Sequence, residues 1–140
     1  IVQVAKEETI HFGLLSQRLA DLDSFYGAHP THDGLWTSAY NTIEDHAARL
    51  AVVHCVHEAK GVDVTPKTID KFKRAKDEES AQVLDRIYVD EITHVAKGLK
   101  WFRYLCDQEQ QPHETTFQAK VLKYFGTLRK PFNDEGREAA

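Results

Sequence analysis

The sequence predicts an all-α fold, an antiparallel helical bundle, and three observations support this prediction. Apolar residues recur at steps of three and four along several long stretches, as they do on the buried face of a helix. No stretch alternates apolar and polar residues in the manner of a half-buried strand. The connecting segments are short, which favours antiparallel neighbours. We therefore expect residues 1–140 to form a single helical domain.

The first two helices are expected on either side of a polar loop at residues 24–34. The first covers about residues 1–22, with an apolar stripe at Ile1, Val4, Phe12, Leu15, Leu19 and Leu22. The second covers about residues 35–60, carries several alanines and stops at Gly61. The pair Thr65-Pro66 has the pattern of a cap followed by proline at the first helical position. We expect it to start a short basic helix that ends near residue 75.

The longest helix is expected over residues 78–106. Its bundle seam follows steps of three and four through Leu84, Ile87, Glu91, His94, Gly98, Trp101 and Leu105. A last helix is expected over residues 114–125, and Pro131-Phe132-Asn133 offers a turn with a cap for one more helical turn. The chain begins at Ile1 inside an amphipathic pattern, without a capping residue before it. We therefore expect a fragment of a bundle whose first helix lies upstream.

The composition is that of an ordinary globular protein, with 41% apolar and 29% charged residues. A formal charge of −4 gives no electrostatic case for binding nucleic acid or an anionic membrane. No apolar run approaches the roughly 20 residues of a membrane-spanning helix. Two cysteines, Cys55 and Cys106, do not form a disulfide framework, so we expect a cytoplasmic protein.

Two segments share the spacing Glu-x-x-His, namely Glu8 with His11 and Glu91 with His94. Residues three apart on a helix project from the same face, so each pair could bind one metal ion. Both pairs lie on the apolar stripe of their helix, where an unpaired carboxylate is costly and a divalent cation compensates its charge. Glu58 lies on a third helical face, which includes the small residues Ala47 and Ala51 and could approach the other helices. A lone Glu from each of two helices and a Glu-x-x-His pair from each of two others form the di-metal site of ferritin-like bundles. The second lone Glu is expected from the upstream helix.

The chain also resembles an uncharacterised ferritin-like family, domain of unknown function 455. The resemblance rests on five blocks, at residues 6–12, 30–36, 58–66, 90–95 and 131–133. It implies a ferritin-like fold and a metal site with Glu8, His11, Glu58, Glu91 and His94 as ligands. More distantly, the chain is similar to di-iron tRNA hydroxylases, which is an analogy of fold alone. The family's own reaction is not established, so the resemblance names no substrate.

Mixed carboxylate and imidazole ligands suit two iron ions, with manganese or zinc as alternatives. We therefore expect an O₂-dependent oxidase or hydroxylase acting on an unknown small-molecule or macromolecular substrate, as a monomer or a homodimer. The alternative is a non-catalytic metal-binding or structural bundle. His32-Asp33 matches the core dipeptide of helical phosphohydrolases, but it lies in a Gly- and Pro-containing loop where we expect Asp33 or Thr31 to cap a helix. Tyr88 is a redox tyrosine or, more simply, a packing residue, and His54 is a candidate partner of Glu58. Asp90 points about a hundred degrees away from Glu91, so we expect it to be an acceptor behind the ligands or a surface group.

Overall fold

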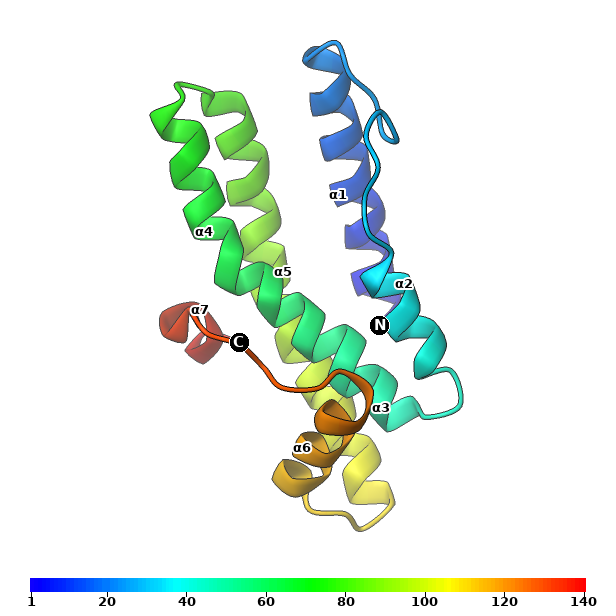
Figure 1. Ribbon diagram of the computed structural model, residues 1–140. Coiled ribbons are helices and arrows are strands. Elements are labelled where there is room, and N and C mark those ends of the chain that lie inside the picture. The colour runs from blue at the N-terminus through cyan, green and yellow to red at the C-terminus, as the bar shows by residue number, and fades with distance from the viewer.

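The computed structural model describes all residues from 1 to 140 and contains only helices, as predicted, with no strand. A long antiparallel pair, α4 and α5, forms the centre, α1 runs beside α5, and α6 closes the lower end (Figure 1). None of the helices combines the length and apolar composition that a membrane crossing requires. The elements in chain order are α1 (Val2–Asp21), α2 (Gly34–Asn41), α3 (His46–Ala51), the π-helix η1 (Val52–His57), α4 (Glu58–Arg74), α5 (Glu78–Gln108), α6 (His113–Tyr124) and α7 (Asp134–Glu138).

The prediction of one helix over residues 35–60 is wrong, because the chain leaves the helix after Asn41 and starts again at His46. The side chain of Asp45 causes the restart, since it accepts a hydrogen bond of 2.9 Å from the backbone N–H of Ala48. Asp33 stands at the start of α2, but its side chain makes no capping hydrogen bond there. Helix α2 therefore begins without the side-chain cap that we expected from the preceding loop.

The predicted stop at Gly61 and the predicted start at Thr65-Pro66 are also wrong, because α3, η1 and α4 run on without a break to Arg74. Proline inside a helix leaves the carbonyl four residues earlier without its partner. That carbonyl belongs to Val62, and it accepts a hydrogen bond of 3.1 Å from the side-chain amide of Asn133. The helix therefore tolerates Pro66 because a distant residue replaces the missing backbone bond.

The π-helical turn η1 lies against α5 at Gly98, which is buried. A Cβ atom at position 98 would lie 2.1 Å from the carbonyl oxygen of His54 and 3.1 Å from Sγ of Cys55. Only glycine leaves room for the backbone of η1 at this distance. The π-helical turn ends at His57, directly before Glu58, so the wider turn helps to set the direction of the Glu58 side chain.

Helix α5 has the predicted extent within two residues, and its first turn is capped by the side chain of Asp77, which accepts from the N–H of Ser80. The predicted seam holds through Gly98 and then shifts. Trp101 is 44% exposed, whereas Phe102 is buried and packs edge-on against Phe117 of α6. The shift follows from α6, which packs on the face of α5 that carries residues 102 and 106.

Helix α1 packs against α5, and only Val4 and His11 among its side chains are buried. Phe12, Leu15 and Leu22 of the predicted stripe are exposed. Helix α5 is the long helix with which α1 makes most of its contacts. Arg18 fastens the far end of α1 through ion pairs of 2.8 Å with Asp77 and 2.6 Å with Glu79.

The C-terminal segment leaves α6, crosses α4 and ends in α7 beside it (Figure 1). Asn133 caps α7, as predicted, by accepting from the N–H of Gly136. Its amide also donates to the hydroxyl of Tyr88 over 2.9 Å, so Tyr88 is a packing residue with a satisfied hydroxyl. The guanidinium of Arg137 holds the carboxylate of Asp63 with two bonds of 2.7 Å.

Candidate metal centre

The structure brings all five predicted site residues together at one point between α1, α4 and α5. Glu8 and His11 come from α1, Glu58 begins α4, and Glu91 and His94 lie in the middle of α5. One ligand atom from each of Glu8, Glu58, Glu91 and His94 lies within 4.8 Å of the others. His11 joins this group through the Glu8 and Glu91 carboxylates, which lie 3.5 and 3.7 Å from its Nδ1.

Burial differs across the site. The two imidazoles are almost completely buried, and the Glu58 and Glu91 carboxylates are mostly buried. The Glu8 side chain remains 46% exposed, so the cluster is open to solvent on its α1 side. Gly61 makes room for the acidic group on α5, since a Cβ at position 61 would touch Oε2 of Glu91 at 3.4 Å. The glycine that resembled a helix stop is therefore a small residue against the site.

Both histidines direct Nδ1 at the carboxylates. Nδ1 of His94 lies 2.9 Å from Oε1 of Glu8 and 3.7 Å from Oε2 of Glu58. These close pairs are not hydrogen bonds, because the Nδ1 atoms of His94 and His11 are the two buried side-chain polar atoms without a hydrogen-bond partner. The imidazole rings stack with centroids 5.6 Å apart. Two free nitrogens therefore face a set of carboxylate oxygens across a small buried space.

The opposite ring atoms are held by a second pair of acids, and the arrangement is reciprocal. Nε2 of His94 on α5 lies 2.8 Å from Oε2 of Glu7 on α1. Nε2 of His11 on α1 lies 3.0 Å from Oδ2 of Asp90 on α5. In a neutral ring, donation from Nε2 to a carboxylate places the proton on Nε2 and leaves a lone pair on Nδ1. A carboxylate behind the imidazole is the usual support of a metal-bound histidine.

Sequence reasoning identified Asp90 as such an acceptor or as a surface group, but it missed Glu7. A signal was present, because both motifs read acid-Glu-x-x-His, with Glu7 before Glu8 and Asp90 before Glu91. An acid at this place stands four residues before the histidine of its own motif, a spacing at which two side chains of one helix can pair. It reaches the histidine of the facing helix instead, which only the packing of α1 on α5 reveals.

The carboxylates of the cluster destabilise one another in their charged forms. Burial, a hydrogen bond with Glu91 and the charge of Glu91 raise the pKa of Glu58 to about 9. Burial and the charge of Glu91 also raise the pKa of Glu8. Behind the imidazole, hydrogen bonds from Lys97, Gln3 and His94 lower the pKa of Glu7 to about 2. Glu7 is thus an anion at neutral pH, whereas Glu58 holds a proton that a cation could displace.

The residues fit a first-row metal ion. Ligand atoms bound at about 2.0–2.2 Å lie at most about 4.4 Å apart across the ion. The 4.8 Å spread of the four ligand atoms therefore requires only a contraction of a few tenths of an ångström. Three carboxylates and an imidazole suit iron, manganese or zinc. This buried carboxylate and histidine cluster could bind metal, as the sequence indicated.

The other candidates lie outside this cluster. His32 and Asp33 are on the loop before α2, where Nδ1 of His32 accepts a bond of 3.3 Å from the N–H of Gly34. Neither belongs to a group of metal-binding side chains. His54 makes no side-chain hydrogen bond, and its carbonyl rather than its ring contacts α5 at Gly98. The suggested pairing of His54 with Glu58 is therefore wrong.

Comparisons with known proteins give a family without a known activity. Residues 1–140 match the family described as "Protein of unknown function (DUF455)". An uncharacterized protein of Haemophilus influenzae is 40% identical over 123 residues, which cover 88% of this chain and 43% of that protein. The chain thus spans less than half the length of this relative. No solved structure matches.

Proposed function

The chain belongs to the DUF455 family of proteins of unknown function, and we propose that its carboxylate and histidine cluster is a dinuclear metal centre, of iron in the first place, within a ferritin-like bundle. We further propose that the protein is an O₂-dependent oxidase or hydroxylase. The single observation that carries the proposal is the pair of buried Nδ1 atoms that have no hydrogen-bond partner and face carboxylates. A cation between them would satisfy the nitrogen lone pairs and the facing carboxylate oxygens together.

The geometry supports two ions better than one. Glu8 and Glu91 lie close to both imidazoles, so these two carboxylates would help to hold a pair of ions. Glu58 lies on the His94 side of this pair. The His11 side has no corresponding third carboxylate among residues 1–140, because Asp90 is engaged at Nε2. We propose that a carboxylate from outside these residues completes the His11 side.

The chain's own residues would position the reaction and manage its protons. When bound, a pair of iron ions would supply electrons to O₂ and so generate the oxidant that acts on a substrate. Glu7 and Asp90 hold both imidazoles in the tautomer and orientation that ligation needs. Glu58 carries a proton at neutral pH in the metal-free site and releases it when an ion binds. The half-exposed Glu8 marks the side from which O₂ and substrate can approach.

Iron loading tests the proposal. The full-length protein, loaded with Fe(II) without oxygen, is expected to bind two ions per chain and to consume O₂ with the appearance of an Fe(III) absorption band. His94→Ala and His11→Ala are expected to lower the stoichiometry, while His29→Ala, which removes an exposed loop histidine, leaves it unchanged. Binding of fewer than one ion per chain, or an equal loss in all three variants, would contradict the metal centre. Two bound ions without O₂ uptake would support the metal centre but refute the proposed oxidase activity.

A non-catalytic metal centre is the second candidate, and one observation favours it. Helix α1 buries only Val4 and His11, so much of its attachment to α5 passes through the site. A cation there would fasten α1 to the rest of the protein. If this is its role, metal removal makes α1 sensitive to proteolysis and the loaded protein consumes no O₂. Manganese and zinc are the alternative ions, and elemental analysis distinguishes them.

A further inference from the structure

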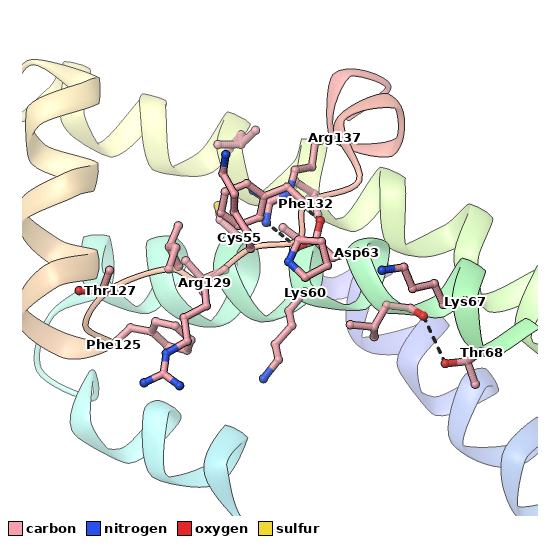
Figure 2. Close-up of a pocket in the computed structure, with 18 of the residues that line it drawn as sticks. Cys55, Lys60, Asp63, Lys67, Thr68, Phe125, Thr127, Arg129, Phe132 and Arg137 are labelled. Carbon is pink, nitrogen blue, oxygen red and sulfur yellow. Dashed lines mark hydrogen bonds and ion pairs between the residues drawn. The ribbon is translucent and has the colours of Figure 1, made fainter.

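A second site lies on the other side of the central helices. A cavity of about 1040 Å³ is enclosed by α4, α5, α6 and residues 125–132, which pass over it on the way to α7 (Figure 2). Its volume is at the upper end of the range of about 300–1,000 Å³ that small-molecule sites occupy. None of the five candidate metal ligands lines it. The cavity is therefore separate from the metal centre, and the inference below does not depend on that centre.

The inner wall of the cavity is apolar. Val56, Ala59 and Val95 are buried at its base, and Leu99 and Phe117 extend the same surface. Of the two threonines in the lining, Thr68 donates its hydroxyl to the carbonyl of Val64 in the same helix, and Thr127 lies on the crossing segment. The base therefore offers contact area but no free donor or acceptor that could recognise a sugar or a nucleobase. An apolar chain or ring is the body that such a wall accommodates.

The mouth of the cavity is positively charged. Five exposed cations line it, and none of them makes an ion pair or a side-chain hydrogen bond: Lys60, Lys67, Lys71, Arg129 and Lys130. The single acid of the lining, Asp63, is already held by Arg137 and by the N–H of Asn133. Figure 2 shows the Lys60 and Arg129 side chains extending to the same side. Five unpaired cations around one opening, in a chain of net charge −4, are a strong local concentration of positive charge.

We propose that this cavity binds an amphipathic organic anion, whose apolar body lies against the inner wall and whose carboxylate or phosphate head lies among the cations. The cations favour an anionic head group, because the lining has no unpaired acid that would repel an anion or attract a cation. The apolar wall favours an apolar body of the ligand. The cations come from α4 and from the crossing segment, so a bound head would join these two parts of the chain.

Calorimetry with three probes of equal chain length tests the proposal on the full-length protein. The probes are decanoate, decyl phosphate and decyltrimethylammonium, each below its micellar concentration. We expect one molecule of either anion per chain, and no binding of the cation with the same tail. Affinity for the anions is expected to fall as NaCl rises, since the exposed cations are screened.

Charge reversal at the mouth supplies the matched comparison. Lys67→Glu with Lys71→Glu, both exposed on α4, is expected to weaken anion binding at least about tenfold. Lys100→Glu, an exposed cation on α5 outside the lining, is the control and should bind as the parent does. Circular dichroism confirms that the variants are folded. Absence of anion binding, equal binding of the cationic probe, or equal effects of the double variant and Lys100→Glu would overturn the proposal. Binding only to anionic vesicles, and not to free probes, would identify a membrane surface and also overturn it.

Discussion

Replacing Gly98 with alanine tests whether the π-helical turn before Glu58 depends on its contact with α5. The new Cβ would lie 2.1 Å from the carbonyl oxygen of His54 and 2.8 Å from its carbonyl carbon. An ordinary contact begins near 3.4 Å, so η1 and α5 would have to separate by about 1.3 Å at this point. The obstacle is backbone rather than the end of a flexible side chain, so a change of rotamer cannot relieve it.

The size of the effect follows from two opposing terms. Overpacking a buried site by one methyl group costs about 1–3 kcal/mol, and the backbone contact places this case at the upper end. Alanine in a helix interior is more favourable than glycine by about 1 kcal/mol. We therefore expect Gly98→Ala to lower the free energy of unfolding by about 2 kcal/mol. Glu58 follows directly on η1, so metal affinity is expected to fall as well.

Urea unfolding of the metal-free protein measures the first effect, and Gly13→Ala is the matched control. Gly13 also lies inside a helix, but a Cβ there meets no atom within 4 Å. The control should therefore gain about 0.5–1 kcal/mol from helix propensity alone. If Gly98→Ala stabilises the protein as much as Gly13→Ala does, the close packing of η1 on α5 is refuted.

Three further predictions concern the charged groups. Because the pKa of Glu58 is raised to about 9, the folded metal-free protein holds a proton that the unfolded chain releases near pH 4.5. The free energy of unfolding of the metal-free protein, measured in urea, should therefore fall as the pH rises from 4.5 to about 9. Glu58→Gln should reduce this pH dependence and also weaken metal binding. An unchanged pH dependence in Glu58→Gln would contradict a raised pKa at Glu58. Asp90→Asn or Glu7→Gln should weaken metal affinity about 10–100-fold without unfolding the chain, as measured by competition with a chelator; unchanged affinity would show that these acids do not support the ligands. Burial raises the pKa of Asp63, but the hydrogen bonds from Arg137 and Asn133 lower it by more, so the pKa lies below that of an ordinary aspartate. The stability that this ion pair contributes is therefore present at pH values above the ordinary aspartate pKa. It is lost as the pH falls through the lowered pKa of the folded protein. Asp63→Asn should cost about 1–3 kcal/mol and expose the C-terminal segment to protease, whereas equal proteolysis of variant and parent would show that the pair does not fix this segment.

The parts of the site that sequence reasoning predicted are those set by local geometry. Two residues three apart on a helix share a face wherever that helix packs, so the Glu-x-x-His pairs could be placed from their spacing alone. The same holds for α5, whose periodic seam extends over most of its length. Glu58 could be included because Ala51 and Ala47 precede it on the same helical face, and the structure does place it beside His94.

The parts that were missed depend on contacts between distant segments. The continuity of α4 through Pro66 rests on Asn133, which supplies the bond to Val62 from the other end of the chain. The role of Glu7 depends on the register between α1 and α5, which no single helix encodes. The exposure of Trp101 follows from where α6 packs on α5. In each case the local pattern was compatible with the observed structure, but another segment decided the outcome.

Anomalous X-ray diffraction at the iron, manganese and zinc edges, on crystals of the full-length protein purified with its metal, tests the central claim most directly. Two anomalous peaks are expected, one bonded to Nδ1 of His94 and one to Nδ1 of His11, with the Glu8 and Glu91 carboxylates between them. Glu7 and Asp90 should remain hydrogen-bonded to Nε2, outside both ions. An absence of anomalous density between α1, α4 and α5, or metal bonded at Nε2 in place of those acids, would contradict this claim.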